Sequence, residues 1–232
     1  MSLHDDLTAC MRLLAFADSA FPVGAFAFSN TLETAAAEGI VSDAASLEAY
    51  VADIARQSAC TDGIAALHAH RSRLRDDYDG VLEADGAAIR CKLNAELRQM
   101  SCRMGKKAAE LAVQILPDAM MSRWLADIAG GNTSGTYPVA QGVLFAAAGV
   151  AEEALFCAHC YGTVNLILNA ALRCVRVSHY DTQRILCRFG RRTAGLYDEI
   201  RHLTPDEIHA FTPQTDILAA LHEKGSRRMF MN

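Results

Sequence analysis

Apolar residues recur every three or four positions along most of this chain, a spacing that places them on one face of an α-helix. The stretch that begins at Ser42-Asp43 gives a clear example, because these two residues can cap a helix at its first turn. The apolar face of that helix comprises Leu47, Val51, Ile54 and Ala55. Few stretches alternate in the way that a β-strand requires. We therefore predict an all-α fold, a single-domain bundle of about ten helices.

The ends of several helices can also be predicted. Ser29 or Asn30 can cap a helix that runs towards Ile40, with Glu33 placed for the return half of a capping box. Residues 81–116 interleave charged and apolar positions until Pro117 stops the pattern. This interval predicts either one long helix or two helices broken near Gly105.

Two stretches, residues 128–151 and 154–172, contain no Asp, Glu, Lys or Arg. Their length would permit membrane spans. The first, however, opens with a glycine-rich loop and contains Pro138, and the second carries His159, Asn165 and Asn169, whose burial in lipid is costly. We predict two buried core helices and no membrane association.

Composition narrows the class of protein. A chain of 232 residues that is 51% hydrophobic and has no Pro/Ser/Gly-rich linker is expected to form one domain, residues 1–232. A net charge of -5 gives no general attraction for nucleic acid. The acidic N-terminus shows no basic, apolar leader, which favours a cytoplasmic protein. The eight irregularly spaced cysteines are interpreted as reduced thiols.

Candidate chemistry is sparse. Cys157, His159 and Cys160 form the one tight group of soft metal ligands, but their apolar surroundings favour a core position. The glycine-rich run at 130–135 lacks the lysine of a phosphate-binding loop, and neither G-x-S-x-G nor H-E-x-x-H occurs. We predict no catalytic residue, resident metal or cofactor.

A cluster of four arginines follows later in the chain, at positions 184, 188, 191 and 192. This cluster forms either a solvated helix face or a docking patch for an acidic protein.

The turn between the first two predicted helices is unusual because it is apolar and aromatic, whereas connecting loops are normally polar. Phe21, Val23, Phe26 and Phe28 lie within eight residues of one another, beside Gly24. Such a turn is either a buried corner between helices or a surface that binds a partner.

This turn resembles the N-terminal signature of the urease accessory protein UreF family, roughly L-x-x-x-D/S-x-x-x-P-x-G-G/S-[FY]-x-x-S-x-G-L-E. The matching residues are Leu14, Asp18, Pro22, Gly24, Phe26, Ser29, Leu32 and Glu33. Ala25, Phe28 and Thr31 depart from the pattern.

Three later segments carry the resemblance to the end of the chain. Residues 137–142 resemble a tyrosine-proline-x-alanine-x-glycine segment, and residues 173–186 a segment that includes Gln183. The ending resembles H-E-x-x-Y-S-R-L-F-x-S, with matches at His222, Glu223, Arg228 and Phe230. Met229 is a conservative change, whereas Ser226 and Arg227 replace a tyrosine and a serine.

The resemblance implies an all-α nickel-insertion chaperone component without catalytic activity of its own. It implies a homodimer that bridges a UreD/UreH scaffold and the GTPase UreG on urease apoprotein, coupling GTP hydrolysis to nickel delivery. Residues 224–232 are expected to form a partner-binding tail. The expected partner-binding residues are Pro22, Gly24, Phe26, Phe28, Ser29, Glu33, Tyr137, Gln183, Arg228, Met229 and Phe230. The competing interpretation is an all-α enzyme, or a small-ligand or metal-binding protein, that uses the Phe26/Phe28 turn or Cys157, His159 and Cys160.

Overall fold

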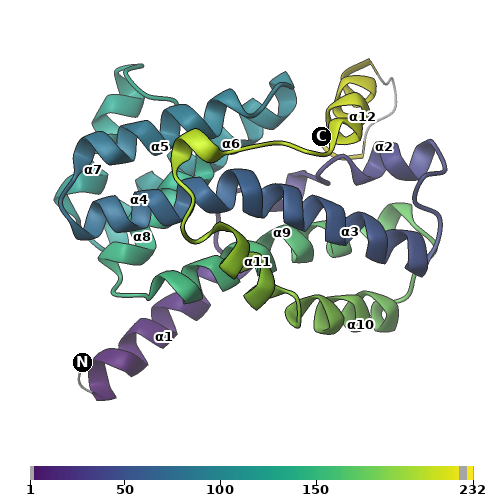
Figure 1. The fold of residues 1–232 in the computed structure, drawn as a ribbon, viewed down its shortest axis with the longest axis horizontal. Helices are drawn as coiled ribbons and strands as arrows, with labels where there is room; N and C mark the ends of the chain where they lie inside the picture. Colours follow the sequence, from purple (N-terminus) through teal and green to yellow (C-terminus); the bar gives the residue numbers. More distant parts are fainter. Residues whose placement is uncertain (1–2, 225–228, 232) are drawn as a thin grey trace.

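The computed structural model describes residues 3–224 and 229–231, and within them it contains helices and no strand (Figure 1). The predicted all-α class is therefore confirmed. The elements are α1 (Leu3–Ala17), η1 (Ala25–Ala27), α2 (Leu32–Ala37), α3 (Ala44–Ser58), η2 (Ala59–Gly63), α4 (Ile64–Leu74), α5 (Tyr78–Arg90), α6 (Ala95–Ile115), α7 (Ala119–Ala129), α8 (Tyr137–Ala147), α9 (Glu152–Cys174), α10 (His179–Gly190), α11 (Thr193–Ile200), η3 (Pro205–Glu207) and α12 (Pro213–Lys224).

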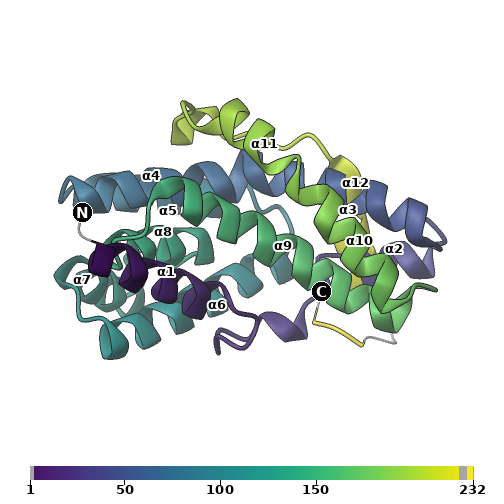
Figure 2. The same cartoon turned by 90° about the horizontal axis from the view of Figure 1, so that it is seen from below.

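Helix α8 lies within the first charge-free stretch and α9 contains the second, and these two helices form the centre of the bundle. Figure 2 shows α9 running along the molecule, with α1 and α10 beside it. By length and composition α9 could cross a membrane. Its buried residues instead pack against helices from both ends of the chain, including α1, α2, α3 and α11. The prediction of two core helices is confirmed.

Helices α3 and α4 follow one another almost in line, joined by one turn of π-helix, η2 (Figure 1). A π turn inserts extra backbone without ending the helix, and such turns frequently occur at functional sites. In this turn Asp62 accepts a hydrogen bond from Lys92 Nζ at 2.6 Å, which ties η2 to the segment after α5.

The break within residues 81–116 lies at residues 91–94 and not near Gly105. The side chain of Asn94 caps α6 by accepting hydrogen bonds from the backbone N–H groups of Glu96 and Leu97. Gly105 lies in the middle of α6, where a Cβ would overlap the backbone oxygen of Gly135. Glycine is needed there for close approach of a loop, and it does not end the helix.

The start of α2 also differs from the prediction. Its N-cap is Thr31 in a left-handed conformation, with no side-chain cap. Ser29 Oγ does accept a hydrogen bond from the N–H of Glu33, at 3.4 Å. The carboxylate of Glu33 accepts hydrogen bonds from the backbone of residues near the C-terminus. The helix ends at Ala37, before Ile40, and Gly39 then adopts φ +73°.

The carboxylate of Asp85, on α5, is fully buried and holds the loop that precedes α8. It accepts hydrogen bonds from the N–H groups of Ser134, Gly135 and Thr136 at 2.7–2.9 Å. The hydroxyl groups of Thr133 and Thr136 donate two more, at 2.5 and 2.6 Å. Because charge-assisted bonds of this kind are strong, the loop and the first turn of α8 are fixed relative to α5.

Replacing this carboxylate tests how much the fold depends on it. Asp85→Ala should lower the free energy of unfolding by roughly 3–5 kcal/mol, because five donors lose their acceptor. Asp79→Ala, at an exposed position on α5, is the matched control and should cost less than about 1 kcal/mol. Urea unfolding followed by circular dichroism measures both. Equal effects of the two substitutions would contradict the proposed role of Asp85.

Candidate partner-binding site

The aromatic turn between α1 and α2 contains both a core residue and a surface residue. Phe28 is 6% exposed and belongs to the hydrophobic core, as does Val23. Phe26 lies in the short helix η1 and is 72% exposed. Gly24, at φ +85°, supplies the left-handed residue before η1, a conformation that favours glycine. Val23 and Phe28 therefore form a buried corner between helices, whereas Phe26 lies on the surface, where it is accessible to a partner.

The C-terminal end of the chain lies against this turn. Glu33, on α2, accepts hydrogen bonds from the backbone N–H groups of Met229 at 2.6 Å and Phe230 at 3.0 Å. The N–H of Met231 donates to the carbonyl oxygen of Ala27 at 2.7 Å. Phe230 is consequently 5% exposed. Two stretches almost 200 residues apart in sequence thus form one surface.

Arg173, near the end of α9, connects the two stretches. Its guanidinium carbon lies 4.1 Å from the ring centroid of Phe26 and 5.3 Å from that of Phe230. Both distances are within the range of cation–π attraction. Met229 is 58% exposed, and Met231 is also exposed. We call Phe26, Arg173, Met229, Phe230 and Met231 the tail–loop surface.

A buried histidine fixes α12 behind this surface. His222 lies between two carboxylates, with Nδ1 2.7 Å from Glu96 and Nε2 3.4 Å from Glu33. Glu223 accepts a further hydrogen bond from the N–H of Ala95 at 3.2 Å. These contacts hold α12 against α2 and α6, and Glu33 takes part in holding both the helix and the terminal residues.

The remaining predicted residues have different surroundings. Pro22 is exposed in the turn, whereas Ser29 is fully buried beside it. Gln183 is exposed on α10 and has none of the contacts recorded for the tail–loop surface. Arg228 lies outside the described residues. The assignment of these positions to partner binding stays a prediction.

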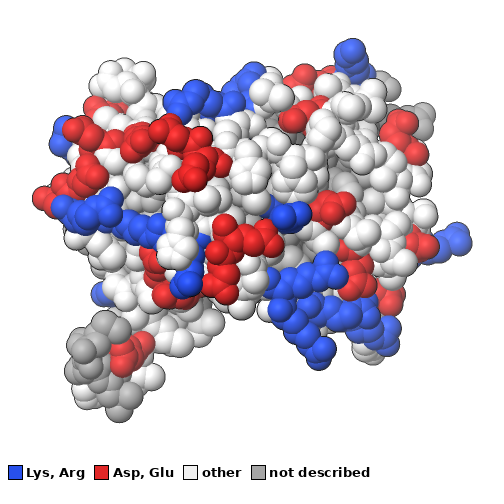
Figure 3. Space-filling model, in the orientation of Figure 1, with Lys and Arg blue, Asp and Glu red and all other residues white. Residues whose placement is uncertain are grey.

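Helix α10 and the two residues that follow it also carry the predicted cluster of arginines, which forms part of a basic area on the face drawn in Figure 3. Arg188 pairs with Glu48 at 2.8 Å, and Arg184 pairs with Asp181 one turn earlier at 3.3 Å. Two arginines of the cluster therefore make ion pairs within the chain, and both remain largely in solvent. This arrangement favours the interpretation as a solvated helix face.

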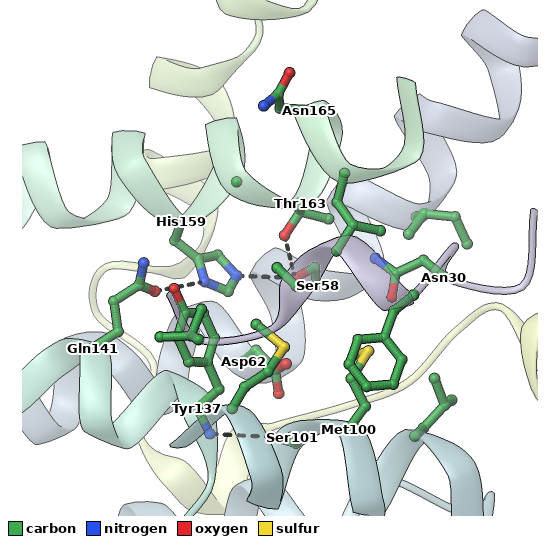
Figure 4. Close-up of a pocket in the computed structure, with 18 of the residues that line it drawn as sticks. Asn30, Ser58, Asp62, Met100, Ser101, Tyr137, Gln141, His159, Thr163 and Asn165 are labelled. Carbon is green, nitrogen blue, oxygen red and sulfur yellow. Dashed lines mark hydrogen bonds between the residues drawn. The ribbon is translucent and has the colours of Figure 1, made fainter. Parts of the chain in front are cut away.

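Behind the turn lies a cavity of about 230 Å³, between α3, α6, α8 and α9. Figure 4 shows a chain of hydrogen bonds along one wall. His159 Nδ1 is 3.3 Å from Gln141 Oε1, and its Nε2 is 2.9 Å from Ser58 Oγ, which lies 3.3 Å from Thr163 Oγ1. Burial lowers the pKa of His159, so the ring is neutral at pH 7. Tyr137 also lines the cavity, and burial raises its pKa to about 12.

The structure separates the candidate metal ligands. Cys157 is exposed and Cys160 is buried, and neither lines the cavity that His159 faces. Burial raises the pKa of Cys160 to about 12, which disfavours the thiolate that binds metals. Among the described residues, no group of three His, Cys, Asp or Glu side chains could hold a metal ion.

Sequence reasoning did not find the contacts of Glu33 with the terminal residues or the stacking of Arg173. The contacts of Glu33 join positions 196 and 197 residues apart, and no local pattern marks such a pair. Arg173 had a faint signal, because it is the first charged residue after a long apolar run. A charge at the end of a core helix must reach solvent or a partner group.

An all-α bundle whose two signature stretches meet on one surface agrees with the class of urease accessory proteins, which are not enzymes. Residues 41–190 match the family model UreF, and this chain belongs to the UreF family. It is 41% identical over 222 residues to the urease accessory protein UreF of Yersinia pseudotuberculosis (strain PB1/+). Proteins of the same name from Yersinia enterocolitica and Yersinia pestis (strain Pestoides F) match equally. In each case the alignment covers 96% of this chain and 97% of the relative.

The two phenylalanines of the turn should respond differently to truncation. Phe28→Ala should cost roughly 3–5 kcal/mol of stability, because it opens a cavity in the core. Phe26→Ala should cost at most about 1 kcal/mol, the value of one exposed cation–π contact. Chemical denaturation of both variants measures the difference. A large loss of stability in Phe26→Ala would show that Phe26 packs in the core and does not lie on the surface.

The role of Glu33 can be tested by amide hydrogen exchange. Glu33→Ala removes the acceptor of two backbone N–H groups, so the amides of Met229 and Phe230 should exchange faster. Glu38→Ala, at the exposed end of the same helix, is the control and should leave their exchange unchanged. Unaltered protection in Glu33→Ala would show that this carboxylate does not hold the terminal residues.

Proposed function

We propose that this chain is an adaptor in urease maturation that bridges a UreD/UreH-type scaffold and a UreG-type GTPase on urease apoprotein. The observation that carries the proposal is 41% identity to UreF proteins over nearly the whole chain. The proposed place of action is the cytoplasm, where the apoprotein would receive nickel. Nickel is the cargo of this process, and the chain acts on its delivery through protein contacts.

The tail–loop surface supports a role in binding the scaffold. It presents an exposed phenylalanine, two exposed methionines and an arginine, which are residue types enriched at protein interfaces. Within this surface the Phe230 side chain is already buried, and Glu33 holds its backbone in place. A partner would therefore meet a surface that is largely ordered before binding, which reduces the entropic cost of association.

The contacts of one loop also support the proposal that the GTPase, and not this chain, binds the nucleotide. The glycine-rich loop at 130–135 does present backbone N–H groups to an anion, but that anion is the chain's own Asp85. The loop is thus occupied and offers no cradle for a nucleotide phosphate. We propose that the GTPase supplies the nucleotide chemistry, and that this chain influences it by binding one nucleotide state more tightly than another.

A homodimer is part of the proposal. Leu7, Met11 and Leu14 occupy one face of α1 at helical spacing, and all three are exposed. An apolar stripe of this kind on a helix is commonly covered by another protein surface. A second copy of the same chain is the proposed occupant, since a symmetric pair would cover both stripes at once.

Binding assays should separate the tail–loop surface from other exposed aromatic residues. Phe26→Ala combined with Met229→Ala should weaken co-purification with the UreD-type scaffold at least tenfold and lower urease activation in a reconstituted assay. Tyr180→Ala, an exposed aromatic residue on α10, is the control and should retain binding. Melting temperatures of all variants should stay close to that of the unaltered chain. Full assembly by the double variant would exclude the tail–loop surface as the scaffold contact.

A further inference from the structure

We propose that the cavity between α3, α6, α8 and α9 binds a small neutral molecule that has an aromatic or apolar body and a single hydroxyl or carboxamide group. This function is additional to the adaptor role and does not depend on it. The inference follows from the order of hydrogen bonds along one wall, the charges in the lining and the apolar character of the other walls.

The hydrogen-bond chain leaves specific groups free for a ligand. Gln141 Oε1 accepts from His159 Nδ1–H, so Nε2 of the ring accepts the proton of Ser58. Ser58 Oγ in turn accepts from the hydroxyl of Thr163. Among the described residues, no hydrogen bond is recorded for the Tyr137 hydroxyl or the amide nitrogen of Gln141. Figure 4 places the Tyr137 side chain beside this wall.

These free groups define the complementary chemistry. A hydroxyl or amide nitrogen can donate to a ligand oxygen, and a tyrosine oxygen can also accept. A hydroxyl or carboxamide head group both donates and accepts, so it can satisfy Tyr137 and Gln141 together. A purely apolar ligand would leave them unpaired in a dry site, which costs affinity.

The charged residues that line the cavity are Asp18, Asp62, Lys92, Arg173 and Asp216. Asp62 and Lys92 form an ion pair at 2.6 Å, and both side chains are largely buried. His159 is neutral because burial lowers its pKa, and Tyr137 keeps its proton because burial raises its pKa to about 12. Arg173 lies near the opening, stacked between Phe26 and Phe230. An anionic ligand would lose its hydration without meeting an unpaired positive charge inside, and it would lie near the carboxylates of Asp62 and Asp216.

The other walls and the size suit an aromatic body. Phe16, Val23, Phe28, Leu97, Met100 and Met104 supply apolar side chains to the lining. A cavity of about 150 Å³ with such walls can bind benzene, and this one measures about 230 Å³. The lining also includes the exposed residues Ser19 and Phe26, so the cavity is reached from the surface of the aromatic turn.

Three probes of similar shape test the proposal on the full-length protein. Phenol has the neutral hydroxyl head, toluene lacks it, and benzoate is ionised at pH 7. Saturation-transfer NMR and thermal melts at rising probe concentration should show that phenol binds at least about threefold more tightly than toluene and at least tenfold more tightly than benzoate. Equal binding of toluene, or tighter binding of benzoate, would overturn the assignment of a neutral polar head group. Failure of all three to bind would overturn the site.

A single-atom deletion locates the probe. Tyr137→Phe removes a hydroxyl that bonds none of the described residues, so folding should be unaffected. The Kd for phenol should rise roughly three- to tenfold, and that for toluene should stay the same. Tyr180→Phe, at an exposed position outside the cavity lining, is the matched control and should leave phenol binding unchanged. An unchanged Kd for phenol in Tyr137→Phe would show that the hydroxyl does not contact the ligand. An equal loss of phenol affinity in both variants would show that phenol binds outside this cavity.

Discussion

The buried carboxylate of Asp85 is the interaction on which the arrangement of the central helices depends. A charge with no exposure to solvent is tolerated only when its lone pairs are satisfied, and five donors from residues 133–136 satisfy them. The loop is thereby held where it meets Gly105 of α6. Helix α8 starts from this point and packs closely on α4, where Gly142 leaves no room for a Cβ against the backbone of Ala66. Tyr137 and Gln141 owe their positions in the cavity to the same anchoring.

Glu33 has a similar role at the other end of the molecule. It is a carboxylate that accepts backbone N–H groups, here from the last residues of the chain instead of an internal loop. Through it the aromatic turn, α12 and the terminal residues form one unit with Arg173. The tail–loop surface and the cavity also share residues, because Phe26, Arg173 and Phe230 line the cavity at its opening. A protein bound at the tail–loop surface would therefore lie over the route by which a small molecule enters.

The resemblance of short segments identified the family correctly, and the partner-binding roles that it implies for individual residues stay predictions. Among the predicted partner-binding residues, Phe26 and Met229 are exposed, whereas Phe28 and Ser29 are buried within the same turn. A motif records which residues recur, and recurrence has at least two physical causes, packing and binding. Tyr137 differs from both groups, because its side chain lines the internal cavity.

By itself the sequence determined the helices, the buried position of α8 and α9 and the family, because apolar periodicity and short motifs are local properties of the chain. It also placed a helix start that relies on adjacent residues, at Ser42-Asp43, where Asp43 is the N-cap. Only the tertiary structure decided that the break falls at 91–94, that Gly105 serves close packing and that Glu33 bonds Met229. These outcomes depend on groups that meet across distant parts of the chain. A hydrogen bond or a steric contact of that kind has no periodicity, so the folded arrangement alone reveals it.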